Sequence, residues 1–221
     1  MLGETKTSAD MPRIAVLGAG HVGSVIARLA AEAGYPVCVA ASGDPEEIAL
    51  TIEVLAPGAE PRWAADAVAN ADIVVLAIPL HEFERMDPEL LTGKVVVDMM
   101  NYWPAVNGFI RTFEDKDLGS SEIVARRLPG STVVKTLNHL GYHQLEEESR
   151  PAGDSERRAL GVAGDNASGV EVVENFIKRI GFDAVPVGNL SAGRLLEPDG
   201  PVFGRPLSRD EFERALGAMA A

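Results

Sequence analysis

Short, continuous apolar runs recur along the chain, separated by segments in which apolar residues return at helical spacing. The runs at 13–17, 37–41, 73–78 and 95–97 stop at Gly, Ser, Pro or Asp, as strands buried on both faces of a parallel sheet do. Between the first two runs, residues 22–33 repeat small and apolar side chains with a helical period and end at Gly34. This alternation predicts an α/β fold, doubly wound around a mainly parallel sheet.

Further elements are expected to continue the alternation toward the C-terminus. Asp44 and Pro45 start a helix that should run to about Ala56. The Glu-rich segment 137–154 is expected to lie over the surface. The remaining expected elements are a short strand near 62–63, a helical turn at 65–70, a helix at 121–128, a strand at 132–136, a strand–helix–strand unit at 160–163, 168–180 and 184–187, an irregular stretch at 189–206 and a last helix at 208–219.

The composition fits this fold and excludes several classes of function. Of the 221 residues, 46% are hydrophobic but only 5% aromatic, so the core should consist mainly of aliphatic side chains. The formal net charge of −13, with no block of Lys and Arg, argues against a nucleic-acid or anionic-membrane surface. No apolar run is long enough to span a bilayer, and Met1–Met11 have the pattern of neither a signal peptide nor an anchor. Because Cys38 has no partner cysteine, a cytoplasmic protein without disulfides is expected.

One glycine motif carries the clearest chemistry. Gly18, Gly20 and Gly23 form an intact GxGxxG directly after the first strand and at the start of the first helix. In this context the first glycine makes a tight turn, the second lets a pyrophosphate approach the backbone, and the third lets the helix pack on the strand. His21 and Val22 complete the turn at a helix N-terminus that offers free N–H donors, although His21 fits a surface histidine nearly as well. The motif predicts a Rossmann-type dinucleotide-binding domain.

The end of the second strand bears on the choice between NAD and NADP. Sites that prefer NAD usually place an acid there to bind the ribose diol. Here Ala41, Ser42 and Gly43 occupy that end, and Asp44 is expected to cap the next helix. No carboxylate would repel a 2′-phosphate, and Ser42 offers it a hydroxyl donor. This pattern favours NADP(H).

The ends of the later strands supply further candidates, because ligands of open α/β sheets bind at the carboxyl ends of strands. The candidates for cofactor contact are Ile78, Pro79, Leu80 and Asn101, and those for substrate contact are Trp103, Leu137, Asn138 and His139. Pro79 could also simply end a strand, and Trp103 could anchor a loop or a subunit contact instead of stacking on a flat ring. We assign no catalytic acid or base, although Asn138 and His139 could face the redox ring. No metal site is expected, because His139 and His143 lack a third ligand at suitable spacing.

These motifs resemble those of the NADP oxidoreductases that depend on the deazaflavin coenzyme F420 and, more loosely, those of the dinucleotide-binding reductase domain of STEAP-type metalloreductases. The likeness covers the GxGxxG turn, Ile78-Pro79, the loop at 101–103, the stretch from 121–125 to 134–138, and 187–190 leading to 194–197. It implies hydride transfer between nicotinamide and the deazaflavin, usually in a homodimer. It also implies that the first loop holds the pyrophosphate and the end of the second strand holds the 2′-phosphate. The archetypal members carry Ser-Arg where this chain has Ala41-Ser42, and their phosphate loop has one more glycine.

The sequence therefore predicts an NAD(P)-binding domain at 12–137 and a smaller lobe at 138–221 that contributes to the substrate site and to dimer contacts. The leading hypothesis is hydride transfer between NADP(H) and an F420-type co-substrate. Such a reaction needs alignment and exclusion of water more than acid–base groups. The alternatives are an NADPH-dependent reductase of another acceptor, such as a flavin, a ferric complex or a small carbonyl, and a non-catalytic protein that senses NADP(H).

Overall fold

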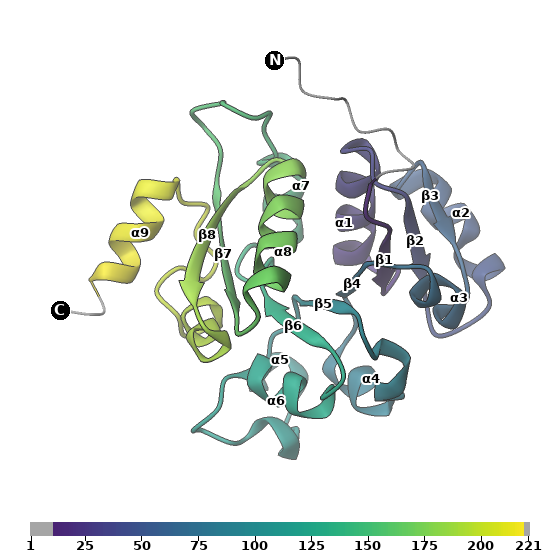
Figure 1. Cartoon of the computed structure of the whole chain (residues 1–221), viewed down its shortest axis with the longest axis horizontal. Coiled ribbons are helices and arrows are strands. Elements are labelled where there is room, and N and C mark those ends of the chain that lie inside the picture. The colour runs from purple at the N-terminus through teal and green to yellow at the C-terminus, as the bar shows by residue number, and fades with distance from the viewer. Residues whose placement is uncertain (1–10, 219–221) are drawn as a thin grey trace.

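A computed structural model describes residues 11–218 of the chain (Figure 1). Within them one sheet has the strand order β3-β2-β1-β4-β5-β6-β7-β8. Its neighbouring strands are parallel except β6 and β7, which are antiparallel. The strands are β1 (Ile14–Leu17), β2 (Val37–Ala40), β3 (Ala59–Pro61), β4 (Ile73–Leu76), β5 (Val95–Asp98), β6 (Thr132–Lys135), β7 (Ala159–Gly164) and β8 (Asp183–Gly188). The predicted Rossmann-type α/β fold with a mainly parallel sheet is confirmed.

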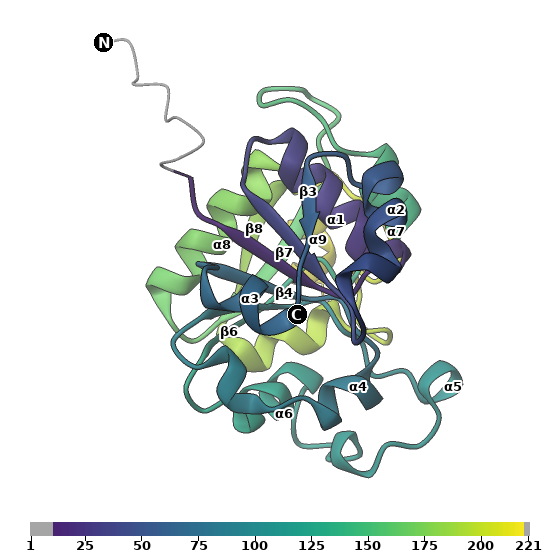
Figure 2. The ribbon, with the colours of Figure 1, turned by 90° about the vertical axis from the view of Figure 1, so that its right-hand side faces the viewer.

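Helices cover both faces of the sheet (Figures 1 and 2). The helices are α1 (His21–Glu32), α2 (Pro45–Leu55), α3 (Ala64–Ala69), α4 (Leu80–Arg85), α5 (Pro104–Asn107), α6 (Ser120–Arg127), α7 (Tyr142–Glu147), α8 (Ala167–Arg179) and α9 (Arg209–Gly217), with short 3-10 helices at Pro88–Leu91, Arg111–Phe113 and Leu190–Leu196. Alternate residues of β1 serve the two faces: Ile14 and Val16 pack with α1, α7 and α8, whereas Ala15 and Leu17 pack with α3, α4 and α6. No helix of the described part is long and apolar enough to cross a membrane.

Capping residues explain where two of the helices begin. The carboxylate of Asp44 accepts a hydrogen bond from the N–H of Glu46, and Pro45 is the first residue of α2. Ser208 and Glu211 form a capping box at the start of α9. This helix ends at Gly217, and the predicted end at Met219, like residues 1–10, lies outside the described residues.

The structure corrects the expectation that 137–154 lies over the surface for the first part of this segment, whereas 151–154 are exposed as expected. Leu137, His139 and Leu145 are fully buried, and Asn138 is almost so. Residues 142–147 form α7, which packs against α1. The Glu residues of this segment dominate its composition, but its leucines are spaced to face the core, and those contacts decide its place.

Smaller corrections concern strand ends. The strand expected near 62–63 lies at Ala59–Pro61, and the strand starting at Ile73 ends at Leu76. Pro79 precedes α4 as its N-cap, so it opens a helix rather than ending the strand. The sheet continues from β6 into β7 across the expected boundary at residues 137 and 138, and the division into two parts stays a prediction.

Candidate functional site

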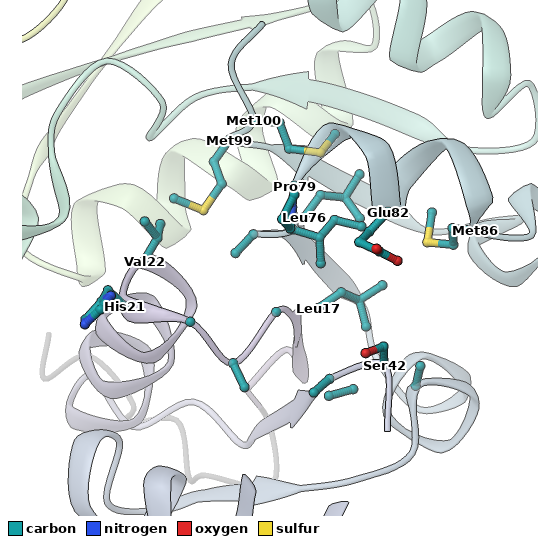
Figure 3. Close-up of a pocket in the computed structure, with 18 of the residues that line it drawn as sticks. Leu17, His21, Val22, Ser42, Leu76, Pro79, Glu82, Met86, Met99 and Met100 are labelled. Atoms are coloured by element: carbon teal, nitrogen blue, oxygen red, sulfur yellow. The ribbon is translucent and has the colours of Figure 1, made fainter. Parts of the chain in front are cut away.

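A cavity of about 740 Å³ opens at the carboxyl ends of β1, β2, β4 and β5 (Figure 3). The chain passes from β1 to β2 on one side and later to β4 on the other, so the strand order reverses at this point, where open α/β sheets bind ligands. The lining residues are Leu17, Gly18, Ala19, Gly20, His21, Val22, Ala40, Ala41, Ser42, Ala64, Leu76, Ala77, Ile78, Pro79, Glu82, Arg85, Met86, Leu90, Met99, Met100 and Tyr142. The cavity thus joins the predicted phosphate turn to the ends of three other strands.

The three motif glycines serve different purposes in the turn. Gly18 has a φ of +122°, and a Cβ there would lie 2.1 Å from the carbonyl oxygen of Ala77. A Cβ on Gly23 would lie 1.9 Å from the carbonyl oxygen of Gly18, so this glycine allows α1 to pack on the turn. A Cβ on Gly20 would meet nothing within 4 Å, and Gly20 lines the cavity. Gly18 and Gly23 therefore leave no room for a side chain, whereas the space in front of Gly20 is free for a pyrophosphate.

The N-terminus of α1 adds donors to this turn. Gly20 is the N-cap of this 12-residue helix, no side chain caps it, and no acidic residue lies in its first turn. The first N–H groups of such a helix have no intrahelical partner and favour an anion. The structure therefore fits a pyrophosphate at the predicted place.

One end of the cavity lies between the end of β2 and helix α4. Ala41 and Ser42 line it as predicted, whereas Gly43 does not, and a Cβ on Gly43 would meet the carboxylate of Glu47 at 2.7 Å. Figure 3 shows Glu82 and Met86 on the side of Ser42, away from His21 and Val22. This end suits the adenosine part of a dinucleotide, which lies beyond the end of β2 in this fold.

The opposite end is mostly apolar and carries one aromatic stack. Val22 and Met99 line it, Met100 lies above Pro79 between the two ends, and the ring of His21 stacks on that of Tyr142 with centroids 5.2 Å apart. Tyr142 comes from α7 and was not predicted, because the polar sequence around it gave no signal of a buried or ligand-lining helix. We assign this end to the nicotinamide and its redox partner.

A buried ion pair lies behind Met100. Asp98 and Lys135 are fully buried, occupy paired positions at the ends of β5 and β6, and approach to 3.5 Å between Oδ2 and Nζ. Asp98 Oδ1 accepts the N–H of Met100 at 3.0 Å, and Lys135 Nζ donates to the carbonyl of the same residue at 2.5 Å. Ser121 donates its hydroxyl to Asp98, and Lys135 also donates to Ser120 Oγ at 3.2 Å. The pair therefore fixes both polar groups of the Met100 backbone.

Asn101 and Asn138 hold each other. The side-chain amide of Asn101 donates to the carbonyl of Asn138 at 2.8 Å, and that of Asn138 donates to Asn101 Oδ1 at 2.9 Å and to the carbonyl of Leu196 at 2.6 Å. Neither side chain lines the main cavity. Their hydrogen bonds fix the loop after β5, and the structure does not support the predicted contacts of Asn101 with the cofactor and of Asn138 with the substrate.

The remaining predicted site residues lie in the core or elsewhere. Leu80 packs inside as the first residue of α4, and Leu137, with φ of 65°, is fully buried. His139 Nε2 accepts the N–H of Gly161 at 3.1 Å, and burial lowers the pKa of this histidine to about 3. The structure does not support His139 as a substrate-facing residue, because its side chain is fully buried and does not line the main cavity.

Trp103 lies at a second, smaller cavity of about 400 Å³. Its ring meets that of Phe203 edge-on, with centroids 6.1 Å apart. The lining residues are Tyr102, Trp103, Pro104, Leu118, Arg194, Leu195, Glu197, Pro198, Asp199, Gly200 and Pro201. Trp103 thus lines the second cavity and not the main one, which the chain leaves after Met100. Among residues 11–218, no group of three or more His, Cys, Asp or Glu side chains is placed to hold a metal ion.

Comparison with known proteins agrees with this geometry. Residues 13–102 match the model of a family described as NADP oxidoreductase, coenzyme F420-dependent. The predicted resemblance to this family is confirmed. The matched segment holds the phosphate turn, Ser42, Ile78, Pro79, Met99 and Met100, all of which line the cavity or form its turn. This match confirms the enzyme class predicted from the sequence, an NADP-dependent oxidoreductase.

Solved structures extend the likeness over nearly the whole chain. A hypothetical protein from Sinorhizobium meliloti has a TM-score of 0.74 and 26% identity, covering 91% of this chain and 98% of its own. A provisionally named F420-dependent NADP reductase from Arthrobacter sp. FB24 has a TM-score of 0.72 and 25% identity, covering 90% of this chain and 100% of its own. An imine reductase from a Pseudomonas species, at 18% identity and a TM-score of 0.58, shares the fold, with 95% of this chain and 63% of its own chain covered. No similar sequence was found among curated proteins.

Proposed function

We propose that the protein transfers a hydride between NADP(H) and a deazaflavin coenzyme of the F420 type. The observation that carries the proposal is the apolar end of the main cavity. Val22 and Met99 adjoin the phosphate turn there, Met100 follows Met99 along the cavity wall, and the ion pair holds the backbone of Met100 in place. Two flat rings that exchange a hydride need apolar walls, close alignment and exclusion of water.

The chain's own residues would divide the work of binding. The Gly18–Gly23 turn and the N-terminus of α1 would hold the pyrophosphate, and Ala41 with Ser42 would contact the adenosine ribose. Ile78 and Pro79 would line the path between the two ends. Bound NADP(H) supplies the carbon that gives or takes the hydride. The family description and the name of the Arthrobacter protein support the deazaflavin as partner.

We further propose that the protein works in the cytoplasm as a homodimer, as the family resemblance implies. Exposed apolar side chains on the loop around α5, among them Val106 and Phe109, support contact with another protein surface.

A direct assay tests the proposed reaction. Purified protein would be mixed with NADPH and oxidised F420, FMN or a ferric chelate, in the presence of a chelator for adventitious metals, and the absorbance of both coenzymes followed in each direction. We expect exchange with F420 to exceed the other two reactions and to disappear in Gly20→Val. If the protein reduced FMN or the ferric chelate but exchanged no hydride with F420, its acceptor would be a flavin or a ferric complex instead. Tight NADPH binding without any turnover would favour a sensor.

A further inference from the structure

An arginine from α4 lines the main cavity, although the end of β2, where the 2′-phosphate is expected, has no cation. Among the described residues that line this cavity, the acidic and basic side chains are those of Glu82 and Arg85, and both belong to α4. Arg85 Nη1 lies 3.1 Å from Glu82 Oε1, and 74% of the Arg85 side chain is exposed. We propose that Arg85 binds the 2′-phosphate of NADP(H) and that Glu82 is the competing partner that sets the selectivity. This inference rests on the proposed dinucleotide site.

The net charge of the molecule favours a local cation at the 2′-phosphate. The chain carries a formal charge of −13, so a phosphate group meets a repulsive background field. Ser42 can donate one hydroxyl bond, but the segment 40–43 contains no Lys or Arg. A guanidinium offers several donors in a planar array that matches phosphate oxygens. Arg85 is placed to supply from α4 what the end of β2 lacks.

The backbone of α4 is held while its polar side chains are exposed. Arg127 of α6 donates to the carbonyl groups of Glu84 and Met86, and its guanidinium lies 5.9 Å from the centre of the Phe83 ring. Residue 85 is thus flanked by two anchored neighbours. Only its side chain needs to turn for the guanidinium to exchange Glu82 for a ligand.

Neighbouring residues place this helix beside the adenosine end. Met86 lines the cavity together with Ser42 and Ala64, and Figure 3 shows Ser42, Glu82 and Met86 on one side of it. A 2′-phosphate attached to a ribose at the end of β2 would therefore face α4.

Glu82 gives the site two possible states. Its Oε1 is 3.1 Å from Arg85 and 3.3 Å from Nε2 of His81. A phosphate would attract Arg85 away from Glu82, whereas the ribose diol of NADH could donate to the Glu82 carboxylate. The same two side chains would then favour NADPH through Arg85 and tolerate NADH through Glu82.

Calorimetry with 2′,5′-ADP and 5′-ADP tests this inference apart from turnover. Arg85→Ala should weaken 2′,5′-ADP binding by roughly tenfold and leave 5′-ADP within about twofold, because one charge-assisted contact is lost. Arg85→Lys should retain most of the affinity, and added salt should reduce the difference between the two nucleotides. Glu82→Gln should tighten 2′,5′-ADP binding by roughly two- to fivefold by removing the competing charge. Arg62→Ala is the matched control, since Arg62 follows β3, pairs with Glu60 and does not line the cavity.

The outcomes separate the inference from the proposed function. If the unmodified protein binds both nucleotides and Arg85→Ala changes neither, or if Arg62→Ala produces the selective loss, the inference is wrong and the dinucleotide site stands. If the unmodified protein prefers 5′-ADP, the 2′-phosphate contact is also wrong. If it binds neither nucleotide, the dinucleotide site itself fails and the inference falls with it.

Discussion

At the phosphate turn, glycines of one motif meet different surroundings, and each can be tested separately. Gly18 and Gly23 face backbone atoms that leave no room for a side chain, whereas Gly20 faces open space in the cavity. Gly20 also has φ of −79°, which any residue adopts. Fold and ligand binding therefore depend on different members of the motif.

The first prediction follows from that difference. Gly20→Val should fold with nearly unchanged stability, because its Cβ meets no atom within 4 Å, yet its methyl groups should keep the pyrophosphate away. We expect NADPH affinity to fall by at least roughly a hundredfold, or about 2.7 kcal/mol, in calorimetry. Gly23→Val is the contrasting variant and should lose the folded state in circular dichroism. Normal NADPH binding by Gly20→Val would contradict the assignment.

The second prediction concerns His139 and pH. Burial lowers its pKa from 6.5 to about 3, so below pH 6.5 the unfolded chain takes up a proton that the folded chain excludes. Its contribution to stability is complete above that value and is lost as the pH falls toward 3. At about pH 5 the loss should be on the order of 2 kcal/mol.

Urea unfolding between the two pKa values measures this effect. His139→Gln keeps an acceptor near the N–H of Gly161 and should flatten the dependence of the unfolding free energy on pH. His81→Gln is the control, because the His81 side chain is 62% exposed. An unchanged slope in His139→Gln would show that other groups cause the pH dependence.

Local sequence predicted some site residues and missed others for physical reasons. The GxGxxG turn and Ser42 were found because both depend on the residues next to them in the chain. Tyr142 and Arg85 were missed because their place in the cavity depends on how distant helices pack. Asn101 and Asn138 are polar at strand ends, yet their side-chain amides donate to each other's residue, which their sequence positions do not show.

At the scale of elements, one ion pair joins two strands to the wall of the cavity. Asp98 and Lys135 end β5 and β6, and both contact the backbone of Met100. Removing one partner leaves the other charge buried without compensation, which costs far more than losing a surface pair.

Lys135→Met is therefore expected to lower the unfolding free energy by roughly 3–5 kcal/mol in urea titration. The double variant Asp98→Asn/Lys135→Met should regain part of this loss, because no charge remains buried. In Lys178→Met, which breaks the partly exposed pair with Glu174, the loss should stay below about 0.5 kcal/mol. If Lys135→Met and Lys178→Met lowered the unfolding free energy equally, the buried pair would contribute no more to stability than the surface pair.

The elements themselves were largely predictable, and the errors have a common cause. Continuous apolar runs gave β1, β2, β4 and β5, since strands buried on both faces need apolar residues throughout. Helix α7 was missed because its six residues are too few to show a helical period among several Glu. The short β3 was displaced because an edge strand carries little apolar signal.

For the whole molecule, the loop between β5 and α6 is a projecting segment that leaves large apolar side chains uncovered. Figure 2 shows this loop, with α5, extending from the body of the protein. Val106 is 71% exposed and Phe109 76%, while Trp103 at its base is 46% exposed. Exposed apolar side chains gathered on a projecting loop are typical of subunit contacts.

The last prediction is that this loop holds the proposed homodimer together. Burying side chains such as Val106 and Phe109 contributes roughly 1.5–3 kcal/mol each, so Val106→Ser/Phe109→Ser should raise the dimer dissociation constant well over tenfold. Sedimentation velocity over a range of concentrations would measure it. Leu50→Ser/Val54→Ser is the matched control, because both residues are similarly exposed but lie on α2, which does not project. If the unmodified protein were monomeric, the proposed homodimer would be wrong. If the α2 variant dissociated the dimer and the loop variant did not, the interface would lie on α2 instead of the loop. Because the net charge of −13 makes two copies repel each other, added salt should strengthen the dimer if apolar contacts carry it.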